Sequence, residues 1–236
     1  MTVIKMNKLS FYEQVGIVIP GAVFVFGVMF YVPDLRDVLA KDGVSIGGLG
    51  IFVIISYAAG HLLAGLGNGI ENVYWHWRCR GGMPSNWIVG RSPRLLSSGQ
   101  IGKIEALVSS RLGISVPPLA GVTASAWLPI FRQIYSDVDR HGKLDRGDTF
   151  NGIYGLNRGL SAAALALAVA VIILAPAHWV VSVGLLAVSL IYLYRMHRFG
   201  VHYAREVYNQ FLLLPPDPVK PKPVKAKNDK PDLLKA

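Results

Sequence analysis

The sequence contains three long runs without a charged side chain, and these runs limit most strongly how the chain can fold. Residues 15–32, 44–66 and 159–194 contain no Asp, Glu, Lys or Arg. A helix of about 20 apolar residues crosses the hydrocarbon core of a bilayer, which is roughly 30 Å thick. The second run has the length of one crossing, and the third, which Pro176 interrupts, has the length of two. The sequence therefore predicts an all-α, polytopic membrane protein.

Four transmembrane helices are predicted, arranged as two hairpins. The N-terminal hairpin covers residues 1–79, with residues 33–43 as a loop between its helices, and the C-terminal hairpin covers residues 157–214. The predicted spans lie at about 15–32, 44–66, 157–175 and 179–195. Because helical spacing of apolar residues persists beyond the fourth span, its helix is expected to continue into the cytoplasm.

A helical cytoplasmic insertion, residues 80–156, is predicted between the second and third spans. Its apolar residues recur at helical spacing over 99–112 and 124–139, and a third helix is expected to start near Asp148 and to enter the membrane. The tail, residues 215–236, alternates Pro with Lys and has no means of burying a core, so it is predicted to be disordered.

The distribution of basic residues predicts the orientation of the chain. Of 24 Lys and Arg residues, only Arg36 and Lys41 fall in the loop between the first two spans. Lys and Arg mark the cytoplasmic side of a membrane protein. Both termini and the insertion are therefore expected in the cytoplasm. The net charge of +10 is expected to attract anionic lipid headgroups, and nucleic acid is not an expected partner.

A polar face follows the second span towards the cytoplasm. This face consists of His61, Gly65, Asn68, Asn72 and Trp75 at i, i+4, i+7, i+11 and i+14, and Glu71 lies where the helix leaves the membrane. An ionisable side chain in an apolar span is a functional hypothesis by default. Two interpretations remain open: the face lines a path for a proton or an ion, or His61 makes one hydrogen bond to a neighbouring helix.

Basic residues flank the predicted membrane exits and form a candidate interface for anionic headgroups. Its members are Arg78, Arg80, Arg91, Arg94, Arg158, Arg195 and Arg198. The alternative interpretation is ordinary anchoring of the helix ends at the inner surface.

Small and kinking residues predict close helix packing. Pro20 and Gly21 lie inside the first span, where proline frees a backbone carbonyl and usually kinks the helix. Ser56, Gly60 and Ala64 are spaced by four in the second span, and such spacing lets helix backbones approach closely. The partner is either another helix of the chain or a second copy.

Catalytic and metal-binding motifs are absent from the sequence. It contains one cysteine and neither an HExxH nor a GxSxG motif. No catalytic residue, cofactor or metal is therefore predicted.

Short motifs spread over most of the chain resemble a group of bacterial proteins. They are Phe11-Tyr12, Gly16 and Pro20-Gly21; Gly60-His61-Leu62 with Gly67-Asn68; and Phe150, Tyr154 and Arg158. The pattern resembles small bacterial four-span inner-membrane proteins of unknown function. The resemblance implies a multi-pass protein of the bacterial inner (plasma) membrane with an insertion after the second span, and it assigns no functional residues.

The leading functional hypothesis is a non-enzymatic membrane scaffold or sensor that acts through its cytoplasmic helices. It would bind a cytoplasmic protein or further copies of itself, with a partner surface expected around Phe131 and Tyr135. A pore or small transporter lined by the polar face of the second span is the first alternative. A lipid-processing membrane enzyme is the second.

Overall fold

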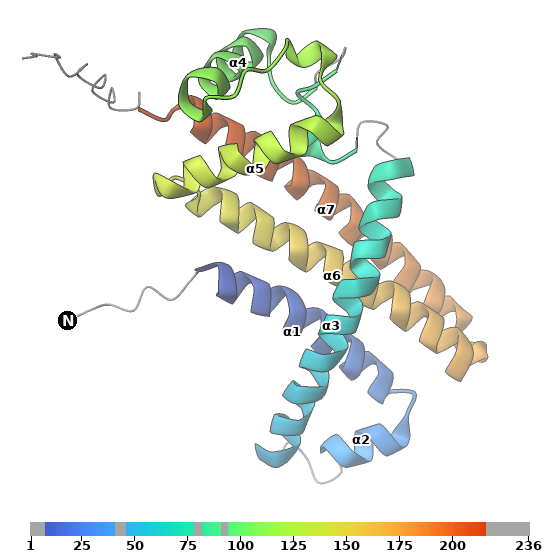
Figure 1. The fold of residues 1–236 in the computed structure, drawn as a ribbon. Helices are drawn as coiled ribbons and strands as arrows, with labels where there is room; N and C mark the ends of the chain where they lie inside the picture. The colour runs from blue at the N-terminus through green and yellow to red at the C-terminus, as the bar shows by residue number, and fades with distance from the viewer. Residues whose placement is uncertain (1–7, 41–45, 78–81, 91–93, 216–236) are drawn as a thin grey trace, which may run out of the picture.

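The computed structural model describes residues 8–40, 46–77, 82–90 and 94–215, and within these ranges the chain is helical without a strand (Figure 1). The elements are α1 (Lys8–Met29), α2 (Pro33–Ala40), α3 (Ile46–Trp77), η1 (Pro84–Asn86), α4 (Ser98–Leu112), η2 (Leu119–Gly121), α5 (Ala124–Arg140), α6 (Asp145–Leu174), η3 (Pro176–His178) and α7 (Trp179–Leu212). The predicted disorder of the tail falls on residues 216–236, outside the described residues.

Helices α6 and α7 form an antiparallel hairpin that is closed by η3, and α1 lies along α6 (Figure 1). Ser161 and Ser189 each donate their hydroxyl to the other's backbone carbonyl, at 3.0 and 2.9 Å. Ser182 donates to the carbonyl of Ala168 at 3.0 Å. These paired hydroxyls fix the register of the hairpin in a region where the packed side chains are mostly small.

Helix α3 crosses α1 at a point where both helices lack side-chain bulk. A Cβ atom on Gly21 would lie 1.8 Å from the carbonyl oxygen of Ser56, and one on Gly60 would lie 2.1 Å from the carbonyl oxygen of Ile17. Such distances permit only hydrogen at these positions. Ser56 and Gly60, two of the residues predicted to allow close packing, therefore meet another helix of the same chain.

The proline in α1 lies against α6. Pro20 has no N–H to donate to the carbonyl of Gly16. Gly159 of α6 faces this place, because a Cβ atom there would lie 2.7 Å from Pro20 Cγ and 3.1 Å from the oxygen of Gly16. Helix α6 thus covers the carbonyl that the proline leaves without its helical partner.

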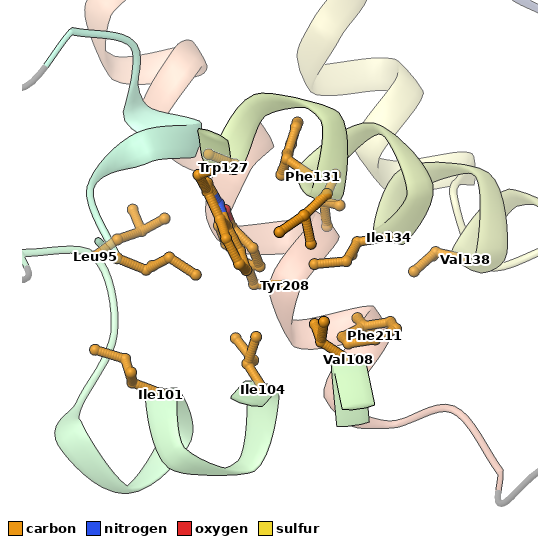
Figure 2. Close-up of a cluster of buried hydrophobic side chains, with 14 of the residues drawn as sticks. Leu95, Ile101, Ile104, Val108, Trp127, Phe131, Ile134, Val138, Tyr208 and Phe211 are labelled. Atoms are coloured by element: carbon orange, nitrogen blue, oxygen red, sulfur yellow. The ribbon is translucent and has the colours of Figure 1, made fainter. Parts of the chain in front are cut away.

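A hydrophobic core lies at one end of the helices, in what we call the helical module: α4, α5, their connecting segments and α7 from Val201 onward. Buried side chains from α4, α5 and α7 converge there (Figure 2). Trp127 Nε1 donates to the hydroxyl of Tyr208 at 2.8 Å, and that hydroxyl donates to the carbonyl of Ser85. The end of α7 is therefore part of the module core.

The helices predicted in the insertion are present, with well-defined starts. Ser97 caps α4 in a capping box with Gln100, and Gly113 ends this helix with a φ of 67°. The side chain of Thr123 caps α5 by accepting from the N–H of Ala126. The last helix of the region, α6, begins at Asp145 and continues without a break into the third apolar run as far as Leu174.

Two expectations from the sequence are wrong. The sequence predicts a loop over residues 33–43, but Pro33–Ala40 is helical, because proline suits the first helical turn and Asp34 adds a favourable acidic group there. Phe131 is expected at a partner surface, but its side chain is buried, because it packs against Tyr208 in the module core with ring centroids 5.4 Å apart.

Within the described part of the chain, three helices are long and apolar enough to cross a membrane: Gly47–Trp77, Asp145–Leu174 and Pro176–Leu212. The apolar part of α1, Val15–Met29, is shorter. Large apolar side chains are exposed on all of them, Phe26, Ile54 and Leu190 among them. A water-soluble protein rarely exposes so continuous an apolar surface, so the helices indicate a membrane-embedded protein.

Candidate functional site

Charged and aromatic side chains meet where α3 crosses the α6–α7 hairpin. We call this site the polar crossing, and its members are Glu71, Trp75, Tyr154, Asn157, Arg158 and Arg195. Its centre is an ion pair in which Arg158 Nη1 donates to Glu71 Oε2 at 2.5 Å. The two side chains are 26% and 12% exposed. An ion pair so shielded from water is costly to break, because the remaining charge lacks compensation.

A glycine makes room for this ion pair. A Cβ atom on Gly67 would lie 3.2 Å from Cγ of Arg158 and 3.7 Å from Cβ of Ala162. The guanidinium stem therefore passes directly over the backbone of α3, and Glu71 follows one helical turn later. Thus Gly67 positions Arg158, and α3 supplies its carboxylate.

Aromatic side chains enclose the ion pair at the end nearer the module. Trp75 Nε1 donates to the hydroxyl of Tyr154 at 3.0 Å, and both side chains are buried. The ring of His197 stacks on Trp75 with a centroid distance of 5.2 Å and an interplanar angle of 28°. Gly200 allows this packing, because a Cβ atom there would lie 3.1 Å from the Tyr154 ring.

The polar crossing extends from α6 to α7 through an amide. Arg195 Nε donates to Asn157 Oδ1 at 3.1 Å, and Asn157 Nδ2 donates to the carbonyl of Ile153 at 2.6 Å. Asn157 is buried, so both ends of its amide have partners. Two neighbouring residues of α6 therefore connect this helix to others: Asn157 contacts α7, and Arg158 contacts α3.

A cavity of about 350 Å³ lies beside the polar crossing, between α1, α3 and α6. Asp148, Asn151, Tyr154 and Arg158 supply its polar lining. Asp148 also accepts a hydrogen bond from the hydroxyl of Tyr135 on α5, at 3.2 Å. Burial, and then the negative charge of Asp148, raise the pKa of Tyr135 to about 12, so this phenol remains a neutral donor at physiological pH.

The predicted polar face divides between two environments. Glu71 belongs to the polar crossing, whereas the side chains of His61, Asn68 and Asn72 are exposed on the outer side of α3. His61 lies against the ring of Tyr57, with centroids 4.6 Å apart. Of these four polar side chains, the structure therefore brings only Glu71 into the polar crossing.

The predicted basic interface is also divided. Arg158 and Arg195 belong to the polar crossing, Arg198 is exposed on α7, and Arg94 is exposed between η1 and α4. Arg78, Arg80 and Arg91 lie outside the described residues.

Trp75 lies on the predicted polar face of α3, but neither it nor Tyr154 or Asn157 was predicted as a site residue. A second signal was the spacing of Tyr154 and Arg158, four residues apart and therefore on one side of α6. In chemical terms the polar crossing is a network of hydrogen bonds and one ion pair that joins α3, α6 and α7. Among the described residues, no group of three or more His, Cys, Asp or Glu side chains is placed to hold a metal ion.

Comparison of the chain with protein-family models, with curated proteins and with solved structures gave no match.

Proposed function

We propose that the chain is a four-span protein of the bacterial inner membrane that acts as a non-enzymatic scaffold. In this proposal both termini and the helical module lie in the cytoplasm. The membrane helices hold the module in a fixed position at the inner surface, where it binds its partner.

The course of α1 supports a fourth span. Gly16 packs beside Gly155, and Gly27 packs against Leu167, so α1 runs parallel to α6. The ring of Tyr31 lies 5.9 Å from that of His178, which places the end of α1 beside the turn between α6 and α7. Val15–Met29 spans about 23 Å as a helix, and the residues up to Val32 are also uncharged.

The charges at the two ends of the helices support the proposed orientation. At the end of the helices where α2 and η3 lie, the described residues contain a single Lys or Arg, which is Arg36. At the module end they include Arg146, Arg195 and Arg198, together with the basic residues of α4 and α5. Lys and Arg near helix ends favour the cytoplasmic side.

The observation that carries the scaffold proposal is the continuity of α7. Its first half exposes large apolar side chains, from Trp179 to Tyr194, and its last turns place Val207, Tyr208 and Phe211 in the module core. One unbroken helix therefore belongs to both the membrane part and the module. The polar crossing adds a second connection, because it joins α3, α6 and α7 at the junction between the two parts.

A distance measurement tests whether the module is held rigidly. Cysteines for spin labels would replace the exposed residues Ser109 on α4 and Leu190 on α7, after exchange of Cys79 for serine. In lipid nanodiscs we expect one narrow distance distribution, unchanged between thin and thick bilayers. The variant Tyr208→Phe, which removes the hydrogen bonds to Trp127 and Ser85, is expected to broaden it. A broad or multimodal distribution in the parent protein would contradict the scaffold proposal.

A pore between several copies is the second candidate function. It is favoured by the exposure of His61, Asn68 and Asn72 on a helix whose neighbouring surface is apolar. Polar side chains in contact with lipid are unfavourable, and a second copy would cover them. The scaffold proposal ranks first because its connections are formed within one chain.

A further inference from the structure

A second polar cavity lies where the start of α6 meets α7, next to the polar crossing, with which it shares Arg195. It has a volume of about 370 Å³, and its lining consists of Arg146, Phe150, Arg195, Arg198, Phe199 and His202. We call it the basic pocket. Arg146 and Phe150 lie on α6, at least 45 residues before the four lining residues of α7, so the antiparallel packing of the two helices assembles the pocket.

Aromatic rings hold two of the arginines in place. The guanidinium carbon of Arg146 lies 5.4 Å from the centroid of the Phe150 ring, and that of Arg195 lies 5.8 Å from the centroid of Phe199. The two phenylalanine rings lie 6.2 Å apart, and Phe150 is 5.6 Å from the ring of His202. Such cation–π contacts orient a guanidinium and leave N–H donors for an external acceptor.

The basic pocket carries a concentrated positive charge. The salt bridges found among the described residues do not involve Arg146, Arg195 or Arg198. The pKa of His202 is lowered, first by burial and then by the positive charges of Arg198, Arg205 and Arg146. Without a ligand, His202 is therefore neutral at physiological pH, and an anion in the pocket would relieve the repulsion among the guanidinium groups.

The location of the basic pocket indicates the source of this anion. The exposed apolar side chains of α7 include Leu190, Ile191 and Tyr194, and the next residue along the helix is Arg195. The pocket thus begins where the apolar surface ends. In the orientation proposed above, this is the depth at which the phosphates of the inner leaflet lie.

We propose that the basic pocket binds the phosphate group of an anionic phospholipid. The guanidinium groups of Arg146 and Arg198 donate to the phosphate oxygens, as arginine does in bidentate phosphate recognition. The acyl chains extend along the exposed apolar face of α7. This inference rests on the proposed membrane orientation, but not on the scaffold role.

Lipid binding to the full-length protein in detergent tests the proposal. Native mass spectrometry would follow a titration with phosphatidylglycerol, with phosphatidylcholine as the zwitterionic comparison. We expect saturable binding of phosphatidylglycerol, weakened about tenfold or more in Arg146→Gln/Arg198→Gln, since each Lys or Arg near an anionic surface contributes about fivefold. The control Lys103→Gln/Arg132→Gln removes the same charge from exposed positions on α4 and α5, and its affinity should remain within about twofold of the parent.

Three outcomes would overturn the inference. The first is an equal loss of binding in both double variants, which would indicate attraction by net charge alone. The second is binding of inorganic phosphate or glycerol phosphate as tight as that of the lipid, which would make the natural ligand a soluble phosphate. The third is an unchanged His202 ring titration, followed by NMR, because a bound phosphate should raise the pKa of this histidine. Loss of lipid binding would leave the scaffold proposal intact, whereas a mobile module would leave lipid binding intact.

Discussion

Replacing Gly60 by alanine should force α1 and α3 apart and destabilise the protein by about 3 kcal/mol, at the upper end of the cost usual for overpacked positions. The reason is geometric, because the added Cβ atom would lie 2.1 Å from the carbonyl oxygen of Ile17. Backbone atoms cannot move aside as a flexible side chain does, so the crossing itself must shift. Unfolding of the purified protein in mixed micelles, followed by helical circular dichroism, would measure this loss.

The matched control lies on the same helix. A Cβ atom on Gly65 would have no side chain and no other helix within 4 Å. Replacement of Gly65 by alanine therefore adds the same methyl group as Gly60→Ala, but on the outer side of α3. Alanine also favours a helix by up to about 1 kcal/mol relative to glycine, so Gly65→Ala should be neutral or slightly stabilising. Equal stability of Gly60→Ala and Gly65→Ala would show that α1 and α3 do not meet at Gly60.

The substitution Glu71→Gln should have an effect of similar size, a loss of about 2–4 kcal/mol. It removes the carboxylate that accepts from Arg158 and leaves a guanidinium that is 26% exposed without its counter-charge. The double variant Glu71→Leu/Arg158→Met removes both charges, and it should recover part of this stability, because apolar replacements of similar size avoid the unpaired charge. Unfolding curves of the parent, of the matched single variants Glu71→Leu and Arg158→Met, and of the double variant give the coupling between the two side chains.

Asn68→Ala provides the control for the ion-pair experiment. Asn68 is a polar residue of the same helix, but its side chain is exposed, and its removal should change the unfolding midpoint little. If the double variant lost, relative to the parent, the full sum of the stabilities lost by Glu71→Leu and Arg158→Met, Glu71 and Arg158 would act independently. That result would contradict the structure of the polar crossing.

The long helices of this protein are predictable from its sequence because their signals are local. Uncharged runs, apolar spacing and capping residues locate α3, α6, α7 and the helices of the module. Helix α2 is different, because eight residues with mixed polarity resemble a loop until proline and aspartate are considered as helix-start residues.

Contacts between helices were predictable only in kind. Spacing by four at Ser56, Gly60 and Ala64 indicates close packing, but no local pattern names Gly21 and Ile17 as the partners. The predicted polar face of α3 starts at His61, one position after the buried Gly60. One residue turns a helix by about 100°, so most of that face points away from the bundle, and only Glu71, near its edge, reaches Arg158.

The candidate sites depend on pairs that are distant in sequence. Glu71 and Arg158 are separated by 87 residues, and Arg146 meets Arg198 only because α6 and α7 are antiparallel. In the sequence, Arg146 lies in a segment of mixed acidic and basic residues, 137–148, which does not indicate a binding pocket. The number of charged residues is therefore known from the sequence, whereas their arrangement around one pocket is known only from the folded structure.

The sidedness of two exposed positions tests most directly the central claim that α3 crosses the membrane and that the helical module lies in the cytoplasm. In a Cys79→Ser background, single cysteines would replace Asp37 on α2 and Ser136 on α5, and bacterial spheroplasts would be treated with a membrane-impermeant maleimide. We expect Asp37→Cys to react in intact spheroplasts and Ser136→Cys to react only after permeabilisation. Reaction of both positions from the same side would contradict the four-span arrangement.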